Sequence, residues 1–443
     1  MRPVQDIARE LGISADDLNL YGKWKAKVSL PALNARSVRR TPGKVVLVTA
    51  MTPTPHGEGK TVTSIGLAMA LQRLGHRSIV CLRQPSLGPV FGVKGGAAGG
   101  GNSTVEPLQE INVKLTGDID SVGTAHNLLA AILDNHISHG NELAIDPRTI
   151  TLKRVMDMND RVLRQIVVGL GGSKNGVPRE TGFEITAASE VMAVLSLSKN
   201  YAELKERLSR MILGYKRDGK TVRVGELNVV GAMAAVLKEA MEPNLVQTVE
   251  GTPAFVHGGC FGNIAHGTTT IISILLARKL ADYCVVEAGF GSDLGAEKFV
   301  DIAARTGGFD VDAAVVVASI RAIKAHSGLD SDESVGSRSE LRAGFENLSK
   351  HIENVRAFGL TPVVALNRFA DDAPADVKQV EDFCATLDIP FAVSTAFEEG
   401  GRGATDLAER VVEASKKVEK AKPLYPLEWS LEEKLKLIVE KIY

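Results

Sequence analysis

The alternation of short apolar runs with helix-like segments is the feature of this sequence that most constrains its fold. Seven runs rich in β-branched residues predict strands, at Val45–Ala50, Ser78–Leu82, Gln165–Gly169, Tyr283–Ala288, Ala313–Ala318, Pro362–Asn367 and Phe391–Ser394. Segments with helical spacing separate them, at Thr61–Leu74, Thr124–Asn135, Glu190–Leu197, Ala202–Ile212, Val230–Met241, Thr268–Leu280, Glu340–Phe358 and Val377–Leu387. Strands that are apolar along their whole length are buried on both faces. The pattern therefore predicts an α/β protein with a mostly parallel sheet and helices on both faces.

The loop that follows the first apolar run has the order of parts of a phosphate-binding loop. Glycines at positions 57 and 59 let backbone N–H groups face a phosphate, and a helix begins directly after them. Lys60 is placed to reach terminal phosphates and the Thr61 hydroxyl to ligate Mg²⁺. The usual pattern has a glycine five residues before the second glycine, and Thr54 stands there. The strand before the loop and the helix after it favour a P-loop despite this difference.

Length and charge limit the organisation and the partners. A chain of 443 residues is too long to fold around one compact core. We expect a larger P-loop domain over residues 1–339 and a smaller α/β domain over 340–443. The net charge of −1 leaves no basic excess for nucleic acid. The apolar segment Ile271–Leu276 is too short to cross a membrane. Four scattered cysteines without a Cys-x-x-Cys motif predict reduced thiols and a cytoplasmic protein.

Other candidate residues also follow predicted strands, where ligands of parallel sheets bind. Gly95–Gly101 is unusually rich in small residues and predicts either a flexible loop or a surface that approaches a polyanion closely. Glu287 ends an apolar run, which fits either a ligand of Mg²⁺ or another cation, or a structural hydrogen bond.

Several long motifs are collinear with one family. They are Pro53–Thr61, Leu82–Gly101, Leu115–Asp118, Asp157–Arg161, Gly169–Gly172, Pro243–Thr248, Thr252–Gly259 and Glu287–Gly291. Through them the chain resembles formate–tetrahydrofolate ligase from about Ile7 to its last residue. The resemblance implies that ATP and formate give formyl phosphate, and that tetrahydrofolate takes the formyl group to give 10-formyltetrahydrofolate, ADP and phosphate.

The resemblance also implies roles for individual residues. Lys60 and Arg83 are expected to be catalytic, with Arg83 gripping the acyl phosphate. The expected ATP-binding residues are Thr54, Pro55, His56, Gly57, Glu58, Gly59, Lys60, Thr61 and Asn367. The expected substrate-binding residues are Arg83, Gln84, Phe369 and Phe397, with the two phenylalanines stacking on the pterin. The family further implies a homo-oligomer and stimulation by a monovalent cation such as K⁺ or NH₄⁺.

Three positions depart from the family pattern. Gln84 stands where the family often has Glu, Phe397 stands where Trp is common, and the chain ends at Tyr443 where relatives continue. The last difference leaves three interpretations: a smaller but active ligase, which we favour, a split enzyme with a partner chain that supplies the C-terminal segment, or a paralogue with another acceptor. A nucleotide-dependent switch or partitioning-type ATPase is the alternative from a different class, since such proteins begin with the same strand, loop and helix.

Overall fold

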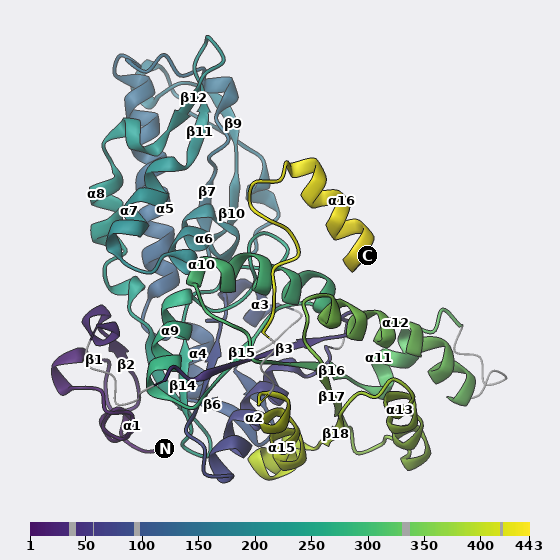
Figure 1. Cartoon of the computed structure of the whole chain (residues 1–443). Helices are drawn as coiled ribbons and strands as arrows, with labels where there is room; N and C mark the ends of the chain where they lie inside the picture. Colours follow the sequence, from purple (N-terminus) through teal and green to yellow (C-terminus); the bar gives the residue numbers. More distant parts are fainter. Residues whose placement is uncertain (35–40, 56, 93–97, 330–336, 417–419) are drawn as a thin grey trace.

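The computed structural model describes residues 1–34, 41–55, 57–92, 98–329, 337–416 and 420–443 (Figure 1). The strands of the main sheet are β1 (Leu18–Leu20), β2 (Ala26–Val28), β3 (Lys44–Ala50), β4 (Ser78–Leu82), β5 (Gly99–Gly100), β6 (Ser103–Glu106), β13 (Asn244–Thr248), β14 (Pro253–Val256), β15 (Tyr283–Glu287), β16 (Ala313–Ala318), β17 (Pro362–Asn367) and β18 (Phe391–Ser394). Three two-stranded ribbons lie outside it, formed by β7 (Arg154–Met156) with β10 (Phe183–Ile185), β8 (Ile166–Val168) with β9 (Arg179–Thr181), and β11 (Ile212–Tyr215) with β12 (Thr221–Arg223).

The α-helices cover this sheet or build a lobe beside it. They are α1 (Val4–Leu11), α2 (Lys60–Arg73), α3 (Leu87–Phe91), α4 (Leu108–Val113), α5 (Asp118–Ser138), α6 (Glu190–Leu197), α7 (Tyr201–Arg210), α8 (Val230–Val236), α9 (Ile271–Leu280), α10 (Arg305–Gly307), α11 (Ile320–Ala325), α12 (Ser337–Ala357), α13 (Pro374–Thr386), α14 (Ala396–Glu399), α15 (Thr405–Ala414) and α16 (Leu431–Ile442). Among the described residues, no helix combines the length and apolar character that crossing a bilayer requires.

The sheet is mostly parallel, as the sequence predicts. Its order is β1–β2–β13–β14–β4–β15–β3–β16–β17–β18, and all neighbouring strands from β14 to β18 run parallel. The strands β1, β2, β6 and β13 form an antiparallel edge. Pairing continues across the expected domain division after residue 339, since β16 pairs with β17. The carboxyl ends of β4, β15, β3 and β17 therefore lie along one edge, where ligands of such sheets bind.

Two apolar cores explain why the parallel strands are uniformly hydrophobic. Along β3, Val46 and Val48 enter the core under α2 and α15, whereas Val45 and Leu47 enter the core under α9 and α12. Figure 1 shows these two pairs of helices on opposite sides of the sheet. A third core lies mainly in a lobe of residues 118–241, which contains α5 to α8 and stands above the sheet in Figure 1; Cys260 and Ile272 also belong to this core. We call it the α5–α8 lobe.

Some predicted elements have different bounds or another place. The run at 165–169 forms β8, but it pairs with β9 outside the parallel sheet, and Val167 is half exposed because nothing covers that face. The helix expected over 268–280 begins only at Ile271, because the Thr270 side chain caps it by accepting from the backbone N–H of Ser273. The segment 230–241 divides into α8 and a 3₁₀ turn.

Candidate active site

The loop after β3 is anchored at its start by helices of the opposite core. The Thr52 hydroxyl accepts a hydrogen bond from Asn347 Nδ2 at 2.8 Å and contacts His351 Nε2 at 2.9 Å. His326 Nε2 lies 2.9 Å from the Thr52 carbonyl oxygen. Burial, together with the charges of His326 and Lys60, lowers the pKa of His351 to about 3, so its neutral ring makes these bonds. No local pattern in the sequence indicates these residues, which lie just after α11 (His326) and on α12 (Asn347 and His351).

The middle of the loop is held by a buried carboxylate. Glu58 is 1% exposed, and its Oε1 accepts the backbone N–H of Thr54 at 2.5 Å. Its Oε2 lies 3.9 Å from Lys60 Nζ. Gly57 and Gly59 have φ values of +74° and +81°, a conformation that glycine adopts without strain. The loop thus closes on itself through Glu58 although Thr54 replaces the usual glycine.

The loop leads directly into the positive end of α2. Gly59 is the N-cap residue of α2, and no side chain caps this helix. The first backbone N–H groups of α2 therefore face the loop. A Cβ at Gly59 would lie 2.3 Å from Asn367 Nδ2, and this amide also donates to the Glu58 carbonyl oxygen at 3.3 Å. Asn367, which ends β17, therefore contacts the loop. Pro55 and Gly57 are exposed at the tip, and His56 between them lies outside the described residues.

Thr61, Glu287 and Arg83 meet at the ends of three adjacent strands. The Thr61 hydroxyl donates to Glu287 Oε2 at 2.6 Å. Arg83 Nη2 lies 3.8 Å from the other carboxylate oxygen, and Arg83 Nη1 donates to the Cys260 carbonyl oxygen at 3.3 Å. The guanidinium also lies against Gly289, where a Cβ would be 2.9 Å from Nη2. These contacts hold the planar guanidinium of Arg83 close to α2, the helix that begins at Lys60.

Cys260, whose carbonyl receives Arg83, has an unusual thiol environment. Its Sγ lies 3.5 Å from His266 Nε2, and both side chains are buried. Burial alone raises a thiol pKa, but the opposing effects of His266 and Arg83 bring the pKa of Cys260 down to about 7. The sequence analysis treated Cys260 only as one of four reduced thiols.

Gln84 is buried beside Arg83 and leads to the next segment. Its backbone N–H donates to the Gly258 carbonyl oxygen at 2.6 Å, while its side-chain Oε1 has no hydrogen-bond partner among the described residues. Two residues further on, Ser86 donates to Asp157 Oδ1 at 2.5 Å. The backbone N–H of Leu87 donates to the other oxygen of Asp157 at 2.9 Å. Asp157 therefore ties the Arg83 loop to the α5–α8 lobe.

The two phenylalanines lie at strand ends but apart from each other. Phe369 stacks against the guanidinium of Arg321, whose Cζ is 4.3 Å from the ring centroid. Phe397 is 53% exposed, and a Cβ at Gly100 would lie 3.1 Å from its ring. Among the described aromatic side chains, these two rings do not stack on one another. The described part of the glycine-rich segment, residues 98–101, thus runs beside Phe397, and residues 95–97 lie outside the description.

Sequence reasoning also missed Asp293. It lies in a π-helical turn, Ser292–Ala296, that follows β15, and its Oδ1 is buried without a hydrogen-bond partner among the described residues. Burial raises its pKa, and the charge of Lys60 opposes that rise. Wide π-helical turns are frequent at functional sites. The one sequence signal for Asp293 is that it follows the strand end at Glu287 by six residues.

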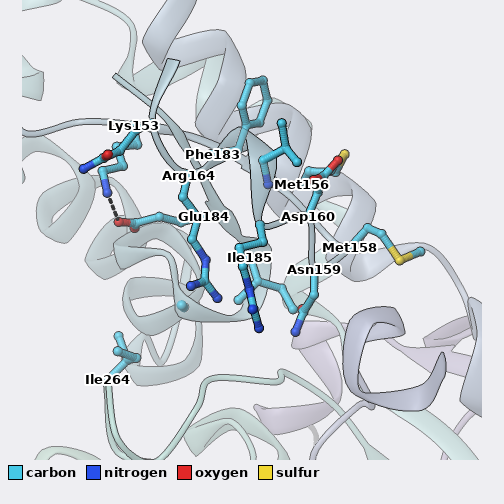
Figure 2. Close-up of a pocket in the computed structure, with 14 residues that line it drawn as sticks. Lys153, Met156, Met158, Asn159, Asp160, Arg164, Phe183, Glu184, Ile185 and Ile264 are labelled. Atoms are coloured by element: carbon cyan, nitrogen blue, oxygen red, sulfur yellow. Dashed lines mark hydrogen bonds and ion pairs between the residues drawn. The ribbon is translucent and has the colours of Figure 1, made fainter. Parts of the chain in front are cut away.

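A cavity of about 790 Å³ lies at the α5–α8 lobe (Figure 2). Its lining comes from the segment around β7 and the Asp157–Arg161 motif, from β10, and from one residue of the loop after β14. The lining residues are Lys153, Met156, Met158, Asn159, Asp160, Arg161, Val162, Arg164, Gln165, Phe183, Glu184, Ile185, Ala188 and Ile264. The cavity combines apolar side chains with cationic ones.

The strand, loop and helix at the carboxyl edge of a parallel sheet define a P-loop-type α/β protein. The sequence comparisons give the particular family. The profile of formate–tetrahydrofolate ligases matches residues 1–443. The chain belongs to the formate–tetrahydrofolate ligase family.

Relatives with that name are similar over the whole chain. The formate–tetrahydrofolate ligases of Caldicellulosiruptor saccharolyticus and Pseudothermotoga lettingae are 51% and 52% identical to it over 445 and 444 residues. The Staphylococcus aureus enzyme is 52% identical over 444 residues. Each alignment covers 100% of this chain and 80% of the relative. The expectation that a partner chain supplies a missing segment finds no support in these alignments. The family identifies an enzyme of one-carbon metabolism that uses ATP, formate and tetrahydrofolate.

Proposed function

We propose that this ligase works through formyl phosphate, with Lys60 and Arg83 as its catalytic residues. The observation that supports the proposal is the meeting of three side chains at the ends of three adjacent strands: Thr61 after β3, Arg83 after β4 and Glu287 at the end of β15. Lys60 precedes Thr61 at the start of α2. Phosphoryl transfer needs such a cluster, because its catalysis rests on positioning and charge neutralisation.

In the first step, a formate oxygen attacks the γ-phosphorus of ATP. The bond from that phosphorus to the β–γ bridging oxygen breaks, ADP leaves, and formyl phosphate forms. Lys60 and the first amides of α2 stabilise the charge on the transferring phosphoryl group. Asn367 and Glu58 keep the loop in shape through their contacts with Gly59 and Thr54.

In the second step, the anilinic nitrogen of tetrahydrofolate attacks the formyl carbon. The bond between that carbon and the phosphate oxygen breaks, the nitrogen loses its proton, and inorganic phosphate leaves with one formate oxygen. Arg83 has a planar fork that suits two phosphate oxygens, and its pairing with Glu287 is long enough at 3.8 Å to be exchanged for a phosphate. In this proposal Phe369 and Phe397 bind the pterin, and Gln84 lines the same site.

The donor groups fit a magnesium ion bound with ATP. The Thr61 hydroxyl lies beside the Glu287 carboxylate, and the buried oxygens Glu58 Oε2 and Asp293 Oδ1 have no hydrogen-bond partner among the described residues. Magnesium needs few protein ligands because phosphates and water complete its shell, which agrees with the finding that the described residues hold no cluster of three His, Cys, Asp or Glu ligands. Bound Mg²⁺ would neutralise phosphate charge. We also propose that the enzyme is a homo-oligomer and that a monovalent cation stimulates it. The resemblance to the family is the support for both.

The test is the substrate dependence of ADP release. ADP is measured with formate alone, with tetrahydrofolate alone and with both. Release that requires both supports the ligase, release with formate alone points to another acyl acceptor, and indifference to both refutes the proposal in favour of a nucleotide switch. The variant Lys60→Ala should lose the activity, and retained turnover would show that the P-loop assignment is wrong.

A further inference from the structure

The loop between β14 and α9 lies around the guanidinium of Arg83. We call residues 258–268 the β14–α9 loop. Near its start, the Cys260 carbonyl oxygen accepts a hydrogen bond from Arg83 Nη1 at 3.3 Å. Near its end, the Gly267 carbonyl oxygen accepts the backbone N–H of Gly289 at 2.9 Å, and Gly289 lies against the Nη2 side of the same guanidinium. The conformation of this loop therefore sets where the planar group of Arg83 can lie.

The side chains of Cys260 and His266 close the β14–α9 loop. Cys260 Sγ lies 3.5 Å from His266 Nε2 and 3.5 Å from the Thr268 carbonyl oxygen. Both side chains are buried, and His266 is 1% exposed. Among the described residues, the thiol is the one group within hydrogen-bonding distance of the His266 ring. Removal of the thiol therefore opens the loop and leaves a buried imidazole without that partner.

The middle of the loop is held in place by other contacts. Gly267 has a φ of +63°, and a Cβ there would lie 2.4 Å from the Cα of Gly262, so the loop is folded closely on itself. Lys298 Nζ donates to the carbonyl oxygens of Gly262 and Ala265 at 2.8 Å and 3.0 Å. Because the middle is fixed, a change at Cys260 acts on the two ends of the loop, which are the parts that hold Arg83.

We propose that Cys260 and His266 are positioning residues for Arg83, because the contact between their side chains keeps the Cys260 carbonyl and Gly289 in place around the guanidinium. This inference rests on the proposed function, in which Arg83 binds the acyl phosphate. The thiol and the imidazole are buried and act through the loop, so they are not catalytic residues. A misplacement of about 1 Å costs up to about 10²-fold in rate, which makes such a contact important for catalysis.

Charge also links the thiol to Arg83. Burial alone raises a thiol pKa, whereas His266 and Arg83 lower the pKa of Cys260 to about 7. The charge of Lys298 also interacts with the thiol, and the Glu287 carboxylate lies 3.8 Å from Arg83 Nη2. An anion bound to Arg83 cancels part of the positive charge that favours the thiolate, so it should raise the pKa of Cys260. By the reciprocity of linked equilibria, the protonated thiol leaves Arg83 more of its charge for an anion.

The first experiment compares wild type with Cys260→Ala, Cys260→Ser and His266→Gln by steady-state ADP release and thermal unfolding. The matched control is Cys384→Ala, which removes a buried thiol of α13. Cys260→Ala should lower kcat/KM by about 10- to 100-fold without a change in the KM for ATP. Cys260→Ser keeps a hydrogen-bonding group opposite His266 and should recover most of the loss.

Cys384→Ala should keep wild-type turnover. Wild-type kcat/KM in both Cys260→Ala and His266→Gln overturns the inference. An equal loss of activity in Cys260→Ala and Cys384→Ala assigns the thiol a general structural role and also overturns it.

The second experiment requires no turnover, so it separates this inference from the proposed function. The ultraviolet absorbance of the Cys260 thiolate, taken as the difference between wild type and Cys260→Ser, is followed against pH with and without inorganic phosphate. The midpoint should lie at about pH 7 in the free protein and move to higher pH with phosphate. In Arg83→Gln the midpoint should be higher from the start and should not respond to phosphate.

These shifts support the coupling of Cys260 to Arg83 even in a protein without ligase activity. The same midpoint in wild type and Arg83→Gln, with and without phosphate, overturns the inference even where ADP release requires both formate and tetrahydrofolate.

Discussion

Adding one methyl group at Gly289 should displace Arg83 without disturbing the fold. A Cβ built at this position lies 2.9 Å from Arg83 Nη2 and 3.3 Å from both Cζ and Nη1. Ordinary contacts begin near 3.4 Å, so the guanidinium must shift by roughly half an ångström or more. Gly289 does not have a positive φ, and an alanine there causes no backbone strain. Misplacement of about 1 Å costs up to about 10²-fold in rate, so we expect kcat/KM of Gly289→Ala to fall by about 10- to 100-fold.

The assay is steady-state ADP release with formate and tetrahydrofolate, together with thermal unfolding. The control is Gly231→Ala in α8, where a Cβ meets nothing within 4 Å, and it should keep wild-type turnover. Gly289→Ala should melt close to wild type while losing activity. Full turnover in Gly289→Ala would show that catalysis does not depend on the position of the Arg83 guanidinium. A large loss of stability would show that the defect is one of folding.

Three other predictions concern the loop, the buried ion pair and pH. Lys60→Ala should lose ADP formation with both substrates present, measured by the same assay; measurable turnover would contradict the role of Lys60. Asp118→Asn leaves the ammonium of Lys27 buried at 1% exposure after losing its 2.6 Å ion-pair partner, so urea unfolding should show a loss of about 3–5 kcal/mol; a loss below about 1 kcal/mol would contradict it. Folded His351 stays neutral down to pH about 3, whereas the unfolded chain takes up a proton below about pH 6.5, so stability from this group is complete above 6.5 and falls between 6.5 and 3. At pH 5 this loss is about 2 kcal/mol. Urea unfolding at pH 5 and 7.5 should show this difference in the free energy of unfolding for wild type and not for His351→Gln. The same pH dependence in both proteins would show that His351 is not its cause.

The parts of the site that the sequence predicts are those that follow a strand directly. Arg83, Glu287 and Asn367 each come at or just after an apolar run, Lys60 ends the loop that follows another, and parallel strands bring such ends to one edge. Local pattern picks out Lys60 and Glu287, whereas Arg83 and Asn367 entered the prediction through the family resemblance. The pairing of β15 between β3 and β4 then joins Thr61 to Glu287.

Other parts of the structure carry no local signal. His326 follows the end of α11, and Asn347 and His351 lie on α12 among other polar residues, so nothing in their spacing marks them as loop anchors. The strand β13 contains Asn244 and Gln247, whose side chains are buried only because distant partners bind them. The order of strands in a sheet depends on such long-range packing and is absent from any short window of sequence.

The measurement that tests the central claim most directly follows the oxygen atoms of formate. With formate labelled in both oxygens with ¹⁸O, the formyl phosphate route transfers one labelled oxygen to each molecule of inorganic phosphate, because phosphate leaves with the oxygen that attacked ATP. Mass spectrometry of the phosphate should show one ¹⁸O per phosphate and an equal amount of 10-formyltetrahydrofolate. Unlabelled phosphate formed together with 10-formyltetrahydrofolate would contradict the account, because the formyl group would then reach the folate without passing through an acyl phosphate.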